Sequence, residues 1–208
     1  LPQEHQLNLF VSAKDAVDNY ITSQHTFDRT LFTQVLNSMR LVMKFGGTSI
    51  GDEKCIANVV RIVKESREAG NEIAVVVSAM TRVTDQLIAT AEEVINCKQK
   101  PALDAFITSI RSRHMKVLEE VAPDYVDEIG EYLDSSLTKL ANILIAIHNL
   151  RELTPRSKDY IISSGERLSA PIISAALRQN GVPSCYMSGC DAGILTDGVH
   201  NSETALPE

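Results

Sequence analysis

Length, composition and charge place this chain among globular proteins and exclude several classes. Its 208 residues are 44% hydrophobic and 23% charged, unlike disordered or fibrous chains. No apolar run approaches the roughly 18 residues that a membrane span needs. The net charge is -7, and no basic stripe with interleaved aromatic residues is present. Neither a membrane nor a nucleic acid is therefore expected as a partner.

Residues 1–38 precede Met39, where the pattern of a folded domain begins. They lack the basic start, apolar core and small-residue cleavage site of a secretory signal, so we expect a cytoplasmic protein. Residues 1–38 are interpreted as an appendage of unknown role, and residues 39–208 as the domain that carries the function.

Cysteines and histidines form no metal or redox pattern. Only Cys185 and Cys190 are close in sequence, and their spacing matches no common zinc site. None of the five histidines belongs to an HExxH pair. No metal ligand is assigned.

Apolar periodicity from Met39 onward predicts alternating strands and helices. A run at 41–45 predicts a strand, and the pattern at 53–68 predicts a helix. The continuous β-branched run at 72–77 predicts a parallel strand that is covered on both faces. These segments form a βαβ unit.

Helical patterns fill most of the remaining chain. They cover residues 82–97, 101–121 and 124–150, and the last two are expected to form an antiparallel pair. The aliphatic stripe of 124–150 indicates core packing, with a subunit interface as the alternative.

A further helix is predicted from Thr154 toward residue 180. Thr154 suits the capping position and Pro155 the first helical position, and Pro171 predicts a kink. The segment 182–187 is then predicted to be a short strand.

A glycine turn follows the first strand. Gly46 and Gly47 let the backbone approach a ligand closely, and Lys44 adds a positive charge beside them. The order differs from a Walker A loop, whose lysine follows its glycines, and from the GxGxxG pattern. On this string alone, a tight turn with a solvated lysine is the alternative to a phosphate site.

Three segments together resemble the aspartate kinases of the amino acid kinase family, and the segment from Glu152 to Ile162 is similar to archaeal-type members in particular. The resemblance covers Met39 to Asp197 in the correct order. Its segments are Lys44-Phe45-Gly46-Gly47-Thr48-Ser49, then Ser78-Ala79-Met80 with Thr84-Asp85, and Ser163-Ser164-Gly165-Glu166-Arg167-Leu168-Ser169.

The resemblance implies a role for each matched residue. Lys44 would contact the ATP phosphates and act in catalysis. Thr84, Glu166 and Arg167 would bind L-aspartate, with Glu166 suited to its ammonium group. The ATP site would comprise Lys44, Phe45, Gly46, Gly47, Ser49 and Ser78. Ser78 and Thr84 as helix caps, and Glu166 with Arg167 as a solvated pair, are the structural alternatives.

The resemblance also implies the fold and the reaction. It predicts an α/β protein, a three-layer α/β/α sandwich with a mainly parallel sheet, incomplete at its carboxy terminus. It predicts transfer of the γ-phosphoryl group of ATP to the L-aspartate side chain, the first step of lysine, threonine and methionine biosynthesis. ATP and Mg2+ are the expected cofactors, and a homo-oligomer is expected for the full-length protein.

Two features depart from the family pattern. Val199-His200 stands where the family usually has a Phe-Gly pair, and no GRGGSD segment is present. Two other hypotheses therefore remain: an amino acid kinase with another acceptor, and a truncated domain that binds a partner but turns nothing over.

Overall fold

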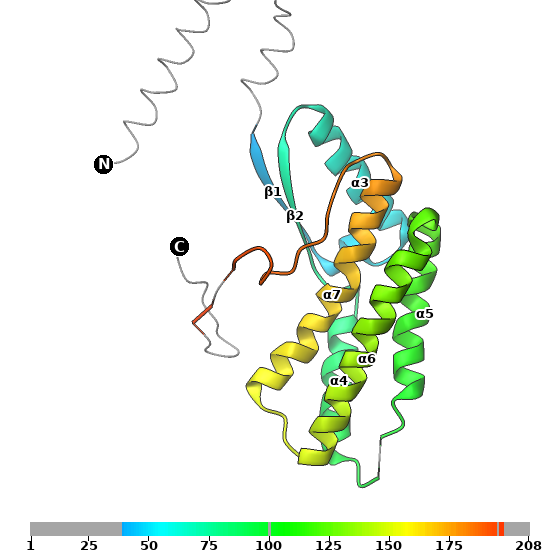
Figure 1. Cartoon of the computed structure of the whole chain (residues 1–208), viewed down its shortest axis with the longest axis vertical. Helices are drawn as coiled ribbons and strands as arrows, with labels where there is room; N and C mark the ends of the chain where they lie inside the picture. The colour runs from blue at the N-terminus through cyan, green and yellow to red at the C-terminus, as the bar shows by residue number, and fades with distance from the viewer. Residues whose placement is uncertain (1–38, 100, 195, 198–208) are drawn as a thin grey trace, which may run out of the picture. The chain divides into compact units, whose positions relative to one another are not determined.

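Two parallel strands and five long helices make up most of the described chain (Figure 1). The computed structural model describes residues 39–99, 101–194 and 196–197. The elements in chain order are β1 (Arg40–Phe45), the short 3-10 helix η1 (Gly47–Ile50), α3 (Glu53–Glu68), β2 (Glu72–Val77), α4 (Val83–Asn96), α5 (Asp104–Val121), the 3-10 helix η2 (Pro123–Tyr125), α6 (Val126–Leu150) and α7 (Pro155–Gln179). The predicted helices and the first two strands are thus confirmed.

β1 and β2 form a parallel pair joined through α3. Their register places Val42 opposite Ala74 and Phe45 opposite Val77. Exposed and half-buried residues alternate along both strands, because successive side chains of a strand point to opposite faces. The half-buried face packs against the helical core through Met43, Phe45, Ile73, Val75 and Val77.

The other face of this two-stranded sheet is open within the described chain. Val42 is 75% exposed and Val76 is 45% exposed, so the prediction that residues 72–77 are covered on both faces is wrong here. A run rich in β-branched residues favours a strand because such side chains pack well on a pleated, half-buried surface. It does not specify that a second layer covers the strand.

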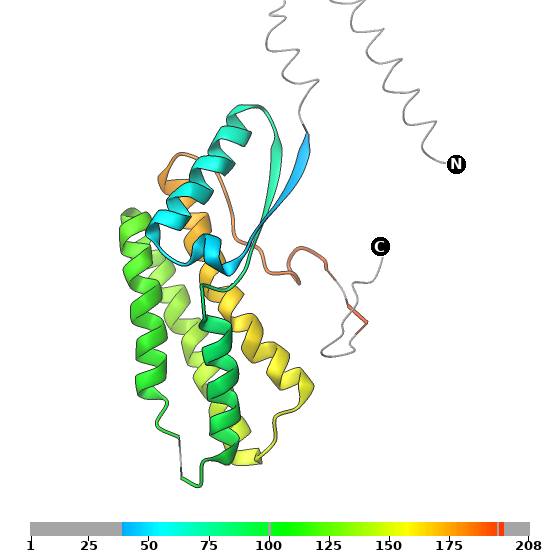
Figure 2. The ribbon, with the colours of Figure 1, turned by 180° about the vertical axis from the view of Figure 1, so that it is seen from behind.

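Helix α7 lies at the centre of the helical part. It contacts α3, α4, α5, α6 and β2, and Figures 1 and 2 show α4, α5 and α6 gathered beside it. Its carboxy-terminal half is almost entirely buried, from Leu168 to Leu177. Since α7 touches both the sheet and the bundle, it can carry side chains to the ends of the strands. None of the helices that the structure describes is long and apolar enough to cross a membrane.

Side-chain caps define two helix starts. The Asp52 carboxylate accepts a hydrogen bond from the Cys55 amide at 2.8 Å and begins α3. The Thr154 hydroxyl accepts from the Ser157 amide at 3.1 Å with Pro155 in the first turn of α7, as predicted.

The helix expected from residue 101 begins three residues later than predicted. The Leu103 amide donates to the Pro101 carbonyl oxygen at 3.1 Å, and α5 starts at Asp104. These three residues form a turn instead of a helical N-terminus.

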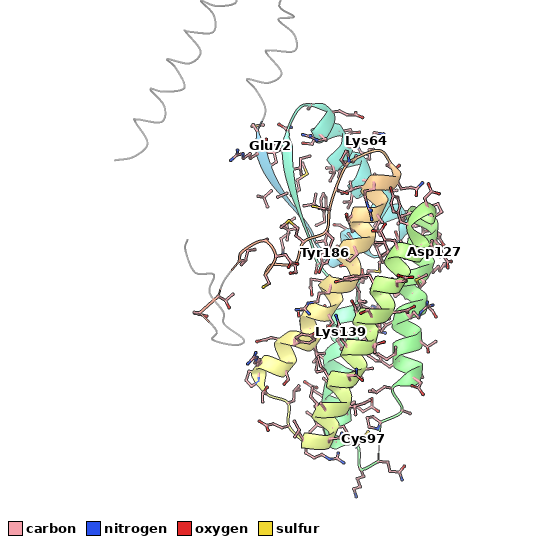
Figure 3. All side chains as sticks on the ribbon, in the orientation of Figure 1. Lys64, Glu72, Cys97, Asp127, Lys139 and Tyr186 are labelled. Carbon is pink, nitrogen blue, oxygen red and sulfur yellow. The ribbon has the colours of Figure 1, made fainter. Side chains whose placement is uncertain are left out.

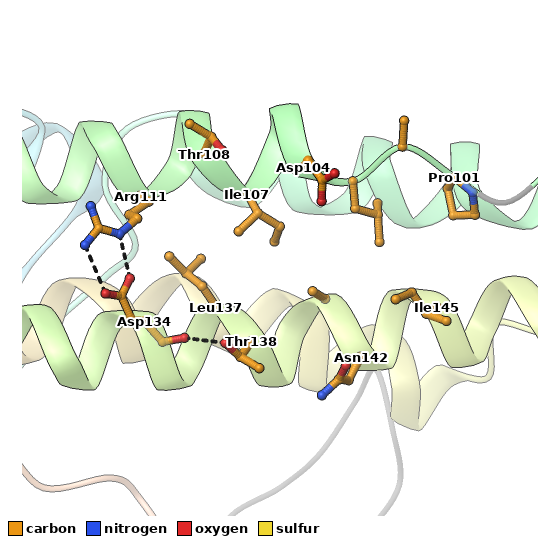
Figure 4. A pocket seen from close by; sticks show the side chains of 13 residues that line it. Pro101, Asp104, Ile107, Thr108, Arg111, Asp134, Leu137, Thr138, Asn142 and Ile145 are labelled. Carbon is orange, nitrogen blue, oxygen red and sulfur yellow. Dashed lines mark hydrogen bonds and ion pairs between the residues drawn. The ribbon is translucent and has the colours of Figure 1, made fainter.

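Helices α5 and α6 run side by side in opposite directions, with an open groove of about 800 Å³ between them (Figure 4). Arg111 of α5 donates two hydrogen bonds to Asp134 of α6, at 2.6 and 2.9 Å. This ion pair lowers the pKa of Asp134 below its ordinary value. The pairing of the two helices confirms the prediction from the sequence.

The predicted strand at 182–187 is wrong, because this segment joins no sheet among the described residues. Side-chain contacts hold it against the helices instead. The Ser184 hydroxyl donates to the Ser174 carbonyl oxygen of α7 at 2.9 Å. The Tyr186 hydroxyl lies 3.4 Å from the Tyr132 hydroxyl of α6, and Figure 3 shows Tyr186 beside α7.

Candidate active site

The carboxyl ends of β1 and β2 lie side by side. Phe45 and Val77 end the two strands as partners, and the Ser78 amide donates to the Phe45 carbonyl oxygen at 3.1 Å. The turn at 46–51 and the turn at 78–82 therefore start from neighbouring points. In open α/β sheets, ligands bind at this edge.

The glycine turn and the turn after β2 are in direct contact. A Cβ added to Gly47 would lie 2.8 Å from the Ala79 carbonyl oxygen, so no larger residue fits there without a shift. The Thr81 hydroxyl donates to the Gly47 carbonyl oxygen at 2.8 Å. A Cβ on Gly51 would lie only 2.6 Å from the same hydroxyl. Small residues are thus required for the two turns to meet.

Three residues of α7 hold the turn after β2 from the other side. The Glu166 carboxylate accepts a hydrogen bond from the Ala79 amide at 3.2 Å, and the Ser169 hydroxyl donates to the Ser78 carbonyl oxygen at 2.7 Å. A Cβ on Gly165 would lie 2.6 Å from the Ala79 Cβ. Gly165 therefore has a packing role in this contact and Glu166 a polar one.

Lys44 lies at the carboxyl end of β1 on the open face of the sheet. It is exposed and pairs in register with Val76, and its side chain makes no hydrogen bond or ion pair with another described residue. Its ammonium group is therefore available to an anionic ligand.

The glycine turn also presents unused amide groups. Within the described chain, the amides of Gly46, Gly47 and Thr48 donate to no backbone carbonyl, whereas the Ser49 amide donates to the Gly46 carbonyl oxygen at 2.9 Å. Nothing lies within 4 Å of a Cβ built on Gly46. Free amides beside an exposed lysine suit the oxygens of a phosphate group.

Thr84 and Arg167 make no hydrogen bond with the glycine turn or with the turn after β2 among the described residues. Thr84 lies in the first turn of α4, and its hydroxyl makes no hydrogen bond to another residue in the described ranges. Arg82, at the start of this helix, adopts the left-handed conformation with φ 65°, which is uncommon for a residue with a side chain. The Arg167 guanidinium stacks over the Tyr160 ring at 4.6 Å.

Arg167 also lies near Tyr186. Burial raises the pKa of Tyr186 above its ordinary value, and the hydrogen bond with Tyr132 raises it further, while the charge of Arg167 lowers it. Tyr186 is therefore protonated at neutral pH and serves as a hydrogen-bonding group.

The structure thus gathers most of the predicted site residues at one edge. Gly46, Gly47, Ser78 and Glu166 lie on the two turns or contact them, and Lys44 lies near the end of β1, two residues before Gly46. Thr81 was not predicted, although it follows directly on the Ser78-Ala79-Met80 motif. A small polar side chain beside the motif was the only local signal for its role. Its hydrogen-bond partner, Gly47, is 34 residues away in the sequence.

The described residues include no group of three or more His, Cys, Asp or Glu side chains that would hold a metal ion.

The model of the amino acid kinase family matches residues 39–206. The chain belongs to this family. The match includes both strand-end turns and α7.

Similar curated relatives of this family member are aspartokinases. It is 27% identical over 166 residues to an aspartokinase of Pseudomonas aeruginosa, covering 80% of this chain and 27% of that protein. It is 30% identical over 156 residues to the chloroplastic aspartokinase 1 of Arabidopsis thaliana, covering 74% of this chain and 26% of that protein. The chain therefore spans about a quarter of the length of these relatives.

Solved structures support the same fold. Aspartokinase III of Escherichia coli in complex with lysine and aspartate matches with a TM-score of 0.67 and 24% identity, over 81% of this chain and 35% of that chain. The same enzyme in complex with aspartate and ADP matches with a TM-score of 0.66 and 22% identity. At this identity the likeness shows the fold, here part of the amino acid kinase fold.

Proposed function

We propose that this amino acid kinase phosphorylates L-aspartate. A side-chain carboxylate oxygen of aspartate attacks the γ-phosphorus of ATP, the bond from that phosphorus to the β–γ bridging oxygen breaks, and 4-phospho-L-aspartate and ADP leave. The carboxylate is already ionised at neutral pH, since its reference pKa is about 4. The reaction therefore needs positioning and charge neutralisation more than a general base.

The proposal rests on one observation: the Lys44 side chain and backbone amides of the glycine turn, none of which has a partner among the described residues, lie together at the end of β1. Lys44 is exposed, and the amides of Gly46 and Gly47 have no backbone acceptor among the described residues. Together they suit the negative charge of the transferring phosphoryl group. Phe45, Ser49 and Ser78 are proposed to complete the ATP site, with Mg2+ bound to the nucleotide.

Glu166 supports an acceptor that carries an ammonium group. Its carboxylate is half-buried and one oxygen accepts from the Ala79 amide, which fixes the position of the other oxygen. We propose that this oxygen binds the aspartate ammonium, with Thr84 and Arg167 as further acceptor-binding residues. The similarity to aspartokinases and the aspartate in the two solved complexes support this acceptor.

The proposal extends to the architecture. The parallel pair of β1 and β2 would belong to a larger, mainly parallel sheet of a three-layer sandwich, with residues 39–208 contributing to the catalytic domain and residues 1–38 an appendage. A homo-oligomer is proposed for the full-length protein.

A coupled assay of ADP release tests the function. It is run with ATP, Mg2+ and L-aspartate on the 208-residue chain and on a fusion that continues it with the remaining residues of a similar aspartokinase. Turnover that is lost in Lys44→Ala supports the proposal. A fusion that is folded and binds ATP but is silent with aspartate refutes it.

Two controls separate the alternatives. A panel of acetylglutamate, glutamate, carbamate and UMP identifies a family member with a different acceptor. Calorimetry that detects no Mg-ATP binding by the folded chain would instead favour a binding domain without turnover.

A further inference from the structure

We propose that Thr81 is a positioning residue that presets an amide of the glycine turn for the nucleotide phosphates. The inference rests on the proposed function, because it assigns the phosphates to this turn. Thr81 is not part of any matched motif, and its hydroxyl makes the side-chain hydrogen bond that links the turn after β2 to the glycine turn, to the Gly47 carbonyl oxygen at 2.8 Å.

The bond from Thr81 also orients the peptide group between Gly47 and Thr48. In a trans peptide the carbonyl oxygen and the following amide hydrogen point in opposite directions, and no cis peptide occurs in the described chain. Since the Gly47 carbonyl points to Thr81, the Thr48 amide points away from the turn after β2. That amide donates to no described backbone carbonyl.

Glycine makes such a constraint necessary. Gly47 has no Cβ to restrict its backbone, so the orientation of the peptide that follows depends on the short 3-10 helix η1, which Gly47 begins, and on the Thr81 hydrogen bond. A free peptide that must be ordered at binding reduces affinity, whereas a preset donor does not. The Thr81 bond adds to η1 in holding this peptide before the ligand arrives.

The surroundings hold the Thr81 hydroxyl in place. The turn that carries it is fixed on its far side by Ser169 and Glu166 of α7, at 2.7 and 3.2 Å from its backbone. Gly51 leaves room for the hydroxyl, because a Cβ there would lie 2.6 Å from it. The Thr81 side chain therefore links the glycine turn to the turn after β2, which Ser169 and Glu166 in turn hold on α7.

Nucleotide binding by substituted chains tests this role. Titrations of Mg-ATP into the 208-residue chain compare the wild type with Thr81→Val, which keeps the shape but loses the hydroxyl, and Thr81→Ser, which keeps the hydroxyl. Loss of one positioning hydrogen bond is expected to raise the Kd of Thr81→Val about five- to tenfold, with recovery in Thr81→Ser to within about twofold of the wild type.

A matched control comes from α6. The Thr138 hydroxyl donates to the Asp134 carbonyl oxygen, also at 2.8 Å, and Thr138 lies away from both turns. Thr138→Val is expected to leave Mg-ATP binding unchanged. Equal affinity of Thr81→Val and the wild type, where Lys44→Ala still abolishes binding, would overturn the inference and leave the proposed function intact.

A second measurement needs no nucleotide. Hydrogen exchange of the Ser49 amide reports on the glycine turn, since this amide donates to the Gly46 carbonyl oxygen at 2.9 Å. Exchange is expected to be faster in Thr81→Val than in the wild type, Thr81→Ser and Thr138→Val. If the wild type binds no ATP, the proposed function fails. If exchange of the Ser49 amide is the same in Thr81→Val and the wild type, the positioning role of Thr81 is rejected, whatever the outcome for ATP.

Discussion

The Ala79 amide donates to the Glu166 carboxylate at 3.2 Å, which joins two residues that lie 87 positions apart in the chain. The turn after β2 and the middle of α7 are thereby fixed to each other at the end of the sheet. One side chain thus has two separable properties: a hydrogen-bond acceptor for the fold and a negative charge for the proposed ligand.

Glu166→Gln and Glu166→Ala are expected to separate these properties. The glutamine keeps a carbonyl oxygen for the Ala79 amide, so its unfolding temperature should stay near that of the wild type. The alanine leaves that amide without its acceptor and should lower the free energy of unfolding by about 1–2 kcal/mol. Both should weaken aspartate binding about tenfold or more, since the charge is lost in each. Unchanged aspartate affinity in the folded Glu166→Gln protein would contradict the acceptor role.

Gly165→Ala is expected to destabilise the fold by overpacking. The new Cβ would lie 2.6 Å from the Ala79 Cβ, and such crowding typically costs about 1–3 kcal/mol. Gly130→Ala in α6 is the control, because its Cβ would meet the flexible end of Met115 at 3.4 Å and alanine favours a helix by about 1 kcal/mol. Denaturant unfolding compares the two.

A compensating change makes this prediction stricter. Ala79→Gly removes the methyl group that the new Cβ would strike, so the Gly165→Ala, Ala79→Gly double variant should recover much of the lost stability. A double variant whose loss equals the sum of the two single losses would show that the contact is not responsible.

Local patterns in the sequence were sufficient for most elements. Helical periodicity and the Thr154-Pro155 start place α7 correctly, and the two apolar runs at 41–45 and 72–77 give the parallel pair. These signals act over a few residues, where propensity and capping decide the structure. Among the candidate site residues, Gly46, Gly47 and Ser78 follow directly on these strands. The roles of Thr84, Glu166 and Arg167, which lie on α4 and α7, came from the resemblance to the aspartate kinases.

Long-range contacts were not predictable in the same way. The Ser169 hydroxyl reaches a carbonyl oxygen 91 positions earlier, at Ser78, and Thr81 reaches Gly47 across 34 positions. Neither partner is marked by local spacing. The same limit explains the wrong strand at 182–187, since an extended segment becomes a strand only where a neighbouring backbone pairs with it.

Acidification is expected to destabilise the protein through His114. This side chain is fully buried, its Nδ1 lies 2.7 Å from the Ile110 carbonyl oxygen, and its Nε2 has no partner among the described residues. Burial lowers the pKa of His114, the Ile110 hydrogen bond raises it, and the charge of Arg113 lowers it. The folded state therefore favours neutral histidine, whereas the unfolded chain binds a proton below pH of about 6.5.

The direction of the effect follows from this difference in pKa. Stability is fully present above the unfolded pKa and falls as pH decreases from about 7 toward 5. Urea unfolding at several pH values should show this slope in the wild type and a smaller slope in His114→Leu, whose side chain does not titrate. An equal slope in both proteins would assign the pH dependence to other groups.

The Arg151 side chain joins the carboxyl ends of α4 and α6. Its guanidinium donates to the carbonyl oxygens of Ile95 and Cys97 at the end of α4, and its own backbone is left-handed, with φ 56°. Arg151→Ala loses the hydrogen bonds and keeps the strained backbone, while Arg151→Gly loses the same bonds but relaxes the strain. Both should lower the free energy of unfolding, and the glycine variant should be the more stable of the two by about 1 kcal/mol. Thermal and urea unfolding measure the difference; an alanine variant at least as stable as the glycine variant would mean that the left-handed backbone at Arg151 carries no strain in solution.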